Sequence, residues 1–126
     1  MTATEHAIEL VQAAARAASD KLASNIIAFD VSEQLAISDA FVLASASNDR
    51  QVKSIVDEIE DKLREIGAKP VRREGERDGR WVLIDYAEIV VHVQHAEERE
   101  FYALERLWRD CPVISMPADV TSGRGR

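Results

Sequence analysis

The chain has 126 residues, of which 46% are hydrophobic and 31% charged, and its formal net charge at pH 7 is -7. This length and this balance are those of one globular domain with a single core, and they exclude a disordered chain. No apolar run approaches the roughly 20 residues of a membrane span, and "MTATEHAIEL" lacks the pattern of a secretory signal. The single cysteine, Cys111, cannot form an internal disulfide. We therefore expect a cytoplasmic protein that does not contact a membrane.

The negative charge also bears on the kind of partner. Phosphate backbones repel an acidic surface, so we expect little direct binding of nucleic acid, and a basic protein is a better match. The one locally basic segment, "KPVRREGERDGR" at residues 69–80, mixes five cations with three acids. Such mixed charges are more typical of a solvated loop than of a phosphate site.

The first part of the chain predicts a helix followed by two strands. Thr2 and Glu5 have the spacing of a capping box, and the apolar residues behind them predict a helix over about 3–23. The short apolar runs "NIIAFDV" (25–31) and "AFVLASA" (40–46) then predict two strands.

A second helix has the strongest pattern in the sequence. Apolar residues recur at steps of three and four, which places them on one helical face: Val52, Ile55, Val56, Ile59, Leu63 and Ile66. Asn48 or Asp49 can cap its start, and Gly67 followed by Pro70 ends it. The charged residues on its other face are typical of a solvated surface.

The last part of the chain predicts three strands and a third helix. Residues 70–73 suit a short edge strand, because it begins with a proline, and residues 80–85 and 88–94 predict two strands around a tight turn. A helix is predicted over about 97–110. We expect its inward residues to be Phe101, Leu104 and Trp108, with Leu107 as a further candidate. Pro112 ends the domain at residues 1–112, and the polar segment 113–126 is expected to be a flexible tail.

The order of these elements indicates one mixed sheet of about five strands flanked by helices, a single-domain α/β fold.

The search for catalytic groups finds no complete set. His92 and His95 are three apart on a predicted strand, so they point to opposite faces and do not share a metal. No nucleophile elbow occurs, and "ASASNDR" (44–50) lacks the glycine of a phosphate loop, so helix capping is its simplest interpretation. We expect no catalytic residue, no metal and no cofactor.

The stretch "WVLIDYAEIVVHV" at residues 81–93 holds Asp85, Tyr86, Glu88 and His92 within an apolar run. Asp85 and Glu88 flank a turn, so Asp85 is better placed to bind nearby backbone amides than to share a magnesium ion. A nucleotide-binding or nucleotidyltransferase-like enzyme that uses these two acids is the alternative hypothesis.

A docking surface fits the same stretch better. Trp81 and Leu83 alternate along a strand and form a flat apolar surface with acids at its margin, which suits a basic protein partner. From spacing alone, the same two side chains fit equally well under a helix. Both interpretations stay open at this point.

Three stretches carry a family resemblance: "SDAFVLASASNDRQVKSIVDEIEDKL" at 38–63, "GRWVLIDYAEIVVHV" at 79–93 and "REFYALERLWRD" at 99–110. In order and spacing they resemble the ribosomal silencing factor family, also called Iojap-related proteins. The resemblance runs from the first helix to about Pro117. It implies a fold like that of nucleotidyltransferases, without their catalytic acids.

The resemblance also implies a function. Members of this family bind the large ribosomal subunit through its ribosomal protein fourteen, where the small subunit would dock. They thereby keep the subunits apart and repress translation when nutrients are scarce. They need no cofactor, are not enzymes, and are often homodimers when free. The acidic charge of this chain suits a basic ribosomal protein.

Carried over position by position, the matching residues are Trp81, Leu83, Asp85, Tyr86 and His92, and then Phe101, Tyr102, Glu105 and Trp108. The residues expected to bind the partner are Trp81, Leu83, Asp85, Tyr86, Glu88 and His92. Phe101 and Trp108 are expected in the core. The sequence departs from the family where Ala46 and Ala87 replace glycines, and an alanine in a turn that needs positive φ would be strained.

Overall fold

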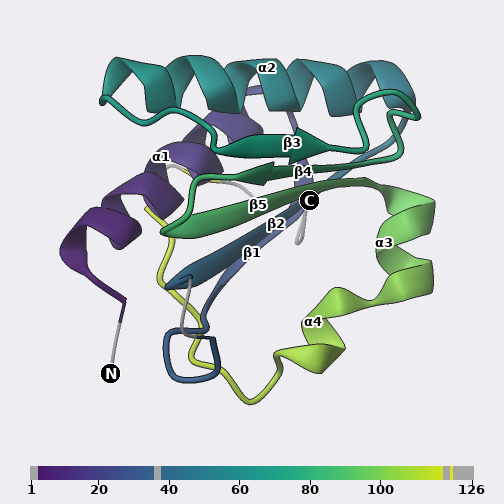
Figure 1. The fold of residues 1–126 in the computed structure, drawn as a ribbon. Helices are drawn as coiled ribbons and strands as arrows, with labels where there is room; N and C mark the ends of the chain where they lie inside the picture. The colour runs from purple at the N-terminus through teal and green to yellow at the C-terminus, as the bar shows by residue number, and fades with distance from the viewer. Residues whose placement is uncertain (1–2, 36–37, 118–119, 121–126) are drawn as a thin grey trace.

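The computed structural model of the chain describes residues 3–35, 38–117 and 120. Its centre is a five-stranded sheet with the order β1-β2-β5-β4-β3 (Figure 1). The strands are β1 (Ser24–Asp30), β2 (Ala40–Ala46), β3 (Arg72–Glu74), β4 (Trp81–Asp85) and β5 (Ile89–His95). β2 and β5 are parallel, and the other neighbours are antiparallel. The predicted α/β fold with a mixed sheet of about five strands is confirmed.

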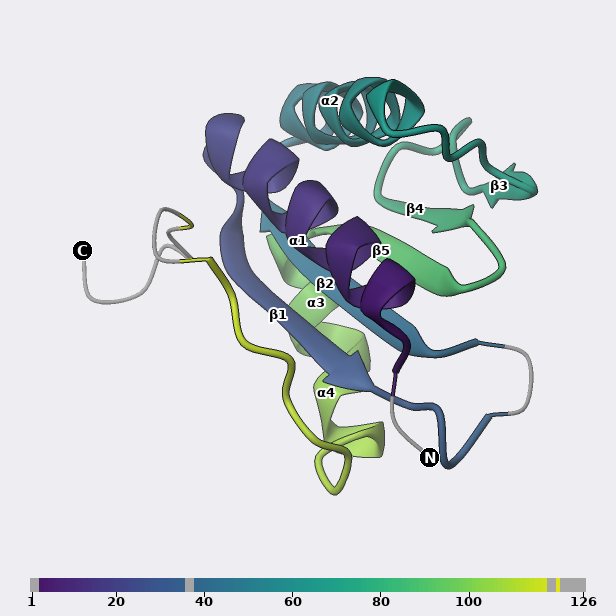
Figure 2. The same ribbon diagram turned by 90° about the vertical axis from the view of Figure 1, so that its left-hand side faces the viewer.

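Two long helices, α1 (Glu5–Asp20) and α2 (Asp49–Glu65), cover one face of this sheet (Figure 2). Side chains alternate along a strand, so every second residue of the central strands lies beneath these helices. Val42, Ile84 and Val91 are fully buried there, together with Ile55 of α2. Each large aliphatic side chain buried in this way stabilises the fold by roughly 1.5–3 kcal/mol. This helix-covered face is the main core.

Side-chain caps determine where both long helices begin. The Thr4 hydroxyl accepts the Ala7 N–H at 3.0 Å, and the Asn48 side-chain oxygen accepts the Gln51 N–H at 2.8 Å. The predicted cap at Asn48 is therefore confirmed. The capping box predicted from Thr2 is wrong, because Thr4 caps the helix; Thr2 itself lies outside the described residues.

The third predicted helix is two helices, α3 (Ala96–Tyr102) and α4 (Leu104–Leu107), on the other side of the sheet (Figures 1 and 2). They meet at Ala103, which adopts a left-handed conformation with φ 48° and ψ 51°. A left-handed residue interrupts the helical path, so the single helix predicted over 97–110 is wrong. Periodicity did not reveal this break, because an alanine gives no signal for it.

The break changes which side chains of this segment face inward. Leu107 is 71% exposed, so its predicted inward position is wrong. Trp108 is half-buried and packs edge-on against Phe41, with ring centroids 5.1 Å apart. The side chains of Phe101, Tyr102, Leu104 and Glu105 lie outside the described part of the structure.

The segment after α4 returns to the edge of the sheet beside β1. Asp30 donates its N–H to the Pro112 carbonyl at 2.8 Å, and Ile114 donates its N–H to the Ala28 carbonyl at 2.9 Å. Ile114 is buried against the main core. The first residues of the segment 113–126, predicted to be a flexible tail, are therefore packed on the sheet. Residues 118–119 and 121–126 lie outside the described residues.

Candidate functional site

The sheet face that points away from α1 and α2 is only partly covered. We call its central part the open face, and it consists of Phe41, Trp81, Leu83, Asp85, Val90 and His92. Strand register brings these side chains together, because Leu83 lies opposite His92, while Asp85 and Phe41 both pair with Val90. The hairpin of β4 and β5 and the strand β2, which is distant from it in sequence, thus build one surface.

Trp81 and His92 are joined within the open face. The Trp81 indole donates its Nε1–H to His92 Nδ1 at 3.1 Å, and their ring centroids are 6.0 Å apart. A neutral imidazole that accepts a hydrogen bond at Nδ1 carries its proton on Nε2. The hydrogen bond fixes the orientation of both rings, so the aromatic surface is ordered before any partner binds.

His92 is held in its neutral form. Burial disfavours the imidazolium, and the nearby positive charge of Arg99 adds to this effect, so the pKa of His92 is lowered from 6.5 to about 4. A positive charge on His92 would be desolvated by burial and repelled by the Arg99 guanidinium. At neutral pH His92 therefore acts as an uncharged hydrogen-bonding group and not as a cation.

Asp85 forms the turn at the end of β4, as its position predicts. Its carboxylate accepts the Ala87 N–H at 2.8 Å and lies 3.6 Å from the Arg72 guanidinium. Ala87 has φ 71°, so the strain predicted for an alanine in place of glycine is present at this turn. The side chain of Asp85 is 22% exposed, which leaves part of its charge accessible at the margin of the open face.

Tyr86 and Glu88, the other two expected partner-binding residues, are not on the open face. Tyr86 is buried in the main core, where burial and the nearby Glu60 carboxylate raise the pKa of its phenol to about 12. Glu88 reaches the opposite layer and pairs with His6 of α1 at 2.7 Å. The structure thus brings four of the six residues together, namely Trp81, Leu83, Asp85 and His92.

A shallow hollow of about 210 Å³ lies in the open face. Phe41, Leu83, Asp85 and His92 line it, together with residues of the connection between β1 and β2. Both apolar and charged side chains line it, and the charged ones are Asp85 and Arg72. Such a hollow suits a protruding side chain of a protein partner.

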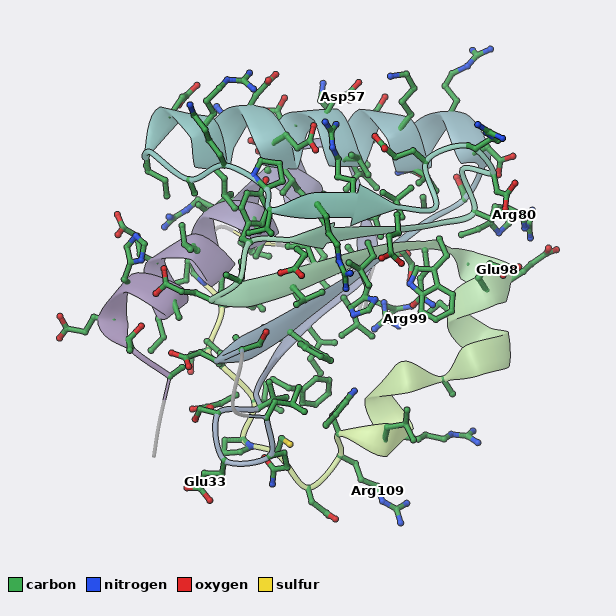
Figure 3. The ribbon with its side chains drawn as sticks, viewed as in Figure 1. Glu33, Asp57, Arg80, Glu98, Arg99 and Arg109 are labelled. Atoms are coloured by element: carbon green, nitrogen blue, oxygen red, sulfur yellow. The ribbon has the colours of Figure 1, made fainter. Side chains whose placement is uncertain are left out.

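Beside the open face is a buried polar row that sequence analysis did not single out. It consists of Ser45 on β2 and Gln94 on β5, and Gln94 is also the cross-strand neighbour of Trp81 on β4, a residue of the open face. Arg99 extends from α3 over this row and donates from Nη1 to the Ser45 hydroxyl at 2.9 Å (Figure 3). The polar residues within the apolar strand "IVVHVQH" were the available signal, because a strand buried on both faces is normally aliphatic.

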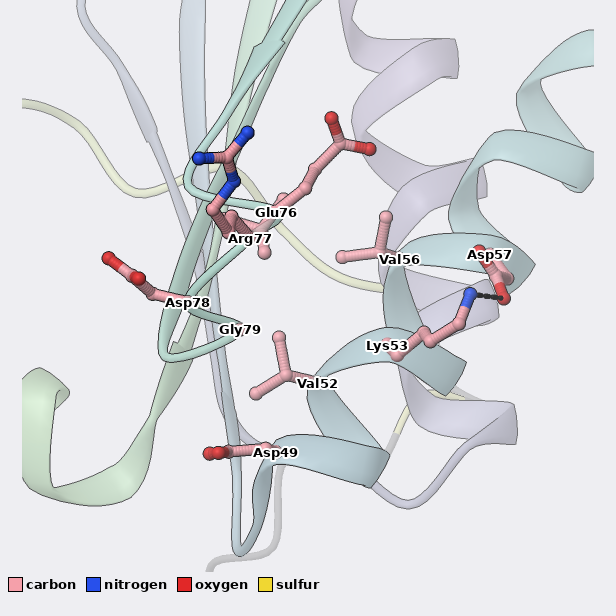
Figure 4. A pocket seen from close by; sticks show the side chains of 10 residues that line it. Asp49, Val52, Lys53, Val56, Asp57, Glu76, Arg77, Asp78 and Gly79 are labelled. Atoms are coloured by element: carbon pink, nitrogen blue, oxygen red, sulfur yellow. Dashed lines mark hydrogen bonds and ion pairs between the residues drawn. The ribbon is translucent and has the colours of Figure 1, made fainter.

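A second hollow, of about 360 Å³, lies between α2 and the loop that joins β3 to β4 (Figure 4). Val52, Val56 and Val82 form its apolar floor. The charged side chains around it are Asp49, Lys53, Asp57, Glu76, Arg77 and Asp78. Lys53 is paired with Asp57 at 3.2 Å. This mixture of charges matches the solvated surface predicted for this helix and loop.

Neither hollow contains an assembled catalytic group. Within the described residues, no three His, Cys, Asp or Glu side chains gather closely enough to hold a metal ion. His95 is used structurally, since its Nδ1 accepts the Glu97 N–H at the start of α3. None of the helices in the described part of the chain has the length and apolarity that a membrane crossing requires. The arrangement of the open face is suited to binding a macromolecule.

These features define a class: a single-domain α/β protein with one helix-covered sheet face and one partly open, aromatic face. The family model described as "Ribosomal silencing factor during starvation" matches residues 4–125, so the chain belongs to the ribosomal silencing factor family. The expected family membership is confirmed.

Individual relatives agree with this assignment. Ribosomal silencing factor RsfS of Bacillus subtilis is 38% identical over 107 residues, which are 85% of this chain and 91% of that protein. Protein Iojap, chloroplastic, of Zea mays is 30% identical over 108 residues, covering 83% of this chain and 46% of that protein. The crystal structure of a protein from Chromobacterium violaceum matches with a TM-score of 0.77 at 31% identity, covering 92% of this chain and 94% of that chain.

Proposed function

We propose that this protein silences ribosomes by docking its open face on the large ribosomal subunit, at ribosomal protein fourteen. Docked there, it would occupy the surface that the small subunit needs, and translation would be repressed when nutrients are limiting. The observation that carries the proposal is the open face itself, an ordered aromatic surface with Trp81 and Leu83 at its centre and Asp85 at its margin. The names of the relatives support the silencing role.

The composition of the open face suits a protein partner. Aromatic side chains contribute strongly to protein interfaces because they bury a large area at a small cost in side-chain entropy. Trp81 is fixed by its hydrogen bond to His92, so little ordering remains to be done when it binds. The net charge of -7 favours approach to a basic protein over ribosomal RNA.

The mechanism is steric and needs no chemical step. A domain of 14.1 kDa that covers an intersubunit contact prevents the two subunits from closing on each other. Binding energy alone does this work, so neither a cofactor nor a catalytic residue is part of the proposal. The proposal also places the protein in the cytoplasm. It further makes the free protein a homodimer before it docks, and analytical ultracentrifugation of the free protein would test this oligomeric state.

The decisive experiment is sedimentation of separated ribosomal subunits with the purified protein. The wild type should travel with the large subunit, not with the small one, and it should reduce the formation of whole ribosomes. Failure to travel with the large subunit would refute the proposal.

Matched variants test the assigned surface. Trp81→Ala and Asp85→Lys should each weaken association with the large subunit by about tenfold or more, the loss expected when a central interface side chain is removed or a charge is inverted. Asp57→Lys on the outer surface of α2 makes the same charge change away from the open face, so it should bind normally. Melting curves establish that each variant is folded. Normal binding by both folded open-face variants would reject the surface and leave the function standing.

A further inference from the structure

Gln94 of β5 has an unusual environment. Its side chain is wholly buried, and both its amide oxygen and its amide nitrogen lack a hydrogen-bond partner in the described structure. Buried amides in folded proteins are nearly always paired, because leaving a desolvated donor or acceptor unmatched destabilises the fold. A hydrophobic residue would serve the free protein better at this position.

His92 repeats the pattern two residues earlier, on the same side of the same strand. Its Nδ1 accepts the Trp81 N–H, which leaves Nε2 as the protonated nitrogen, and Nε2 is buried without a partner. His92 and Gln94 together therefore have two buried donor groups and one buried acceptor without a hydrogen-bond partner. Two such side chains on the central strand point to a ligand that the free protein lacks.

Helix α3 covers the part of the sheet that contains Gln94. Ser45 is the cross-strand neighbour of Gln94, and Arg99 of α3 is buried above the same row with its guanidinium donating to the Ser45 hydroxyl (Figure 3). The start of α3 is further held by Arg80, which pairs with Glu98 at 3.1 Å. This pair is partly exposed, and pairs of that kind contribute little to stability.

The covering segment also ends at a strained joint. Ala103 joins α3 to α4 with φ 48° and ψ 51°, a conformation that L-residues other than glycine, asparagine and aspartate rarely adopt. Strained backbone of this kind persists only where the surrounding structure enforces it. The buried hydrogen bond of Arg99 to Ser45 therefore holds the segment over Gln94, while its start has only partly exposed ion pairs and its end is a strained joint.

We propose that Gln94 is a hidden contact residue: α3 moves aside when the partner docks, and the Gln94 amide then pairs with a peptide group of an extended partner segment. A peptide group presents one donor and one acceptor, which a primary amide matches in full. His92 Nε2–H donates to a neighbouring carbonyl of the same segment. Nucleic-acid bases also pair with amides, but the charge of -7 favours a protein segment. The inference rests on the proposed ribosome docking and identifies the partner chemistry at its centre.

The test compares stability and binding in Gln94→Leu, which keeps a similar side-chain volume and removes the amide. The free variant should melt at a higher temperature than the wild type, because it no longer buries unmatched polar atoms. Its affinity for the large subunit should fall by about tenfold or more, the change expected for losing hydrogen bonds that form on docking. Gln12→Leu makes the same exchange on α1, away from the open face, and should bind normally.

Hydrogen exchange supplies a second readout. The backbone amides of α3 should exchange faster in the complex with the large subunit than in the free protein, since the helix is displaced. A photoreactive residue at position 83, the cross-strand neighbour of His92, should crosslink to a ribosomal protein, and a crosslink to RNA would overturn the assignment to a peptide segment.

The outcomes separate this inference from the proposed function. If the wild type binds and Gln94→Leu binds equally well, the hidden contact is refuted and ribosome docking stands. A lower melting temperature for Gln94→Leu would show that the amide is already paired in the free protein, for example by a buried water, and would also refute it. Slower exchange in α3 on binding excludes the displacement of the helix. If the wild type itself does not bind the large subunit, both proposals fall together.

Discussion

The two faces of the sheet are built from the same strands and have opposite characters. Beneath α1 and α2, Val82 and Ile84 of β4 belong to a core of aliphatic side chains that are closed off from solvent. On the other face, Trp81, Leu83 and Asp85 of the same strand are only half-buried, and their neighbours include a neutral histidine. A face that only had to be stable would resemble the first one. The polar and aromatic content of the open face therefore supports the proposal that this face binds a partner.

The largest expected effect comes from substitutions at two adjacent residues of β4, one on each face of the sheet. Ile84→Ala should lower the free energy of unfolding by about 2–5 kcal/mol, because it leaves a cavity in the closed core. Leu83→Ala, one residue earlier on the open face, should lower it by only about 1 kcal/mol, since this side chain is already partly in water. Chemical denaturation of both variants measures the difference. Equal losses would contradict the division into a structural and a binding face.

The second test uses the pH dependence of stability. In the unfolded chain His92 has an ordinary pKa of 6.5, and in the fold burial and Arg99 lower this pKa to about 4. Between these values the unfolded state binds more protons, so stability falls as the pH falls from about 6.5 to about 4, by about 3 kcal/mol. Above about pH 6.5 the contribution is fully present.

Comparison with His92→Phe isolates this contribution, because the other titrating groups are the same in both proteins. The difference in the free energy of unfolding between wild type and variant should shrink toward pH 4. If the free energy of unfolding of His92→Phe falls with falling pH as steeply as that of the wild type, another group dominates acid unfolding.

The smallest expected effect concerns the turn between β4 and β5. Ala87→Gly relieves the strain of φ 71°, although glycine also gives the unfolded chain more freedom. The net gain in the free energy of unfolding should be about 0.5 kcal/mol, measured by chemical denaturation. Ala28→Gly replaces an alanine that is buried in β1, and it should destabilise the fold. A loss of stability in Ala87→Gly would show that the turn is not strained.

Local patterns predicted the regular elements well. The predicted strand at 40–46 coincides with β2, and Asn48 caps α2 as its position indicates. Gly67 follows the last turn of α2 with φ 88°, a conformation that favours glycine. These features depend on residues close together in the chain, so the sequence is sufficient to locate them.

The site was predicted only in part. Asp85 was expected to bond nearby backbone amides, and it does so, because that interaction spans two residues. Tyr86 and Glu88 were expected on the same surface, but the turn directs Tyr86 into the core and Glu88 toward His6. Beyond the turn, alternation along a strand no longer indicates the direction of a side chain. Gln94 and Arg99 were missed because their importance appears only when β5 and α3 are packed together.

The sequence by itself determined the class of the fold, the positions of the strands and long helices, and membership of the ribosomal silencing factor family, because each of these depends on residue order and spacing. Tertiary structure alone decided which face of the sheet is open, where the last helix breaks, and that Trp81 binds His92. The physical reason is strand register: Trp81 and His92 come from different strands, and only antiparallel pairing of β4 with β5 brings their rings together.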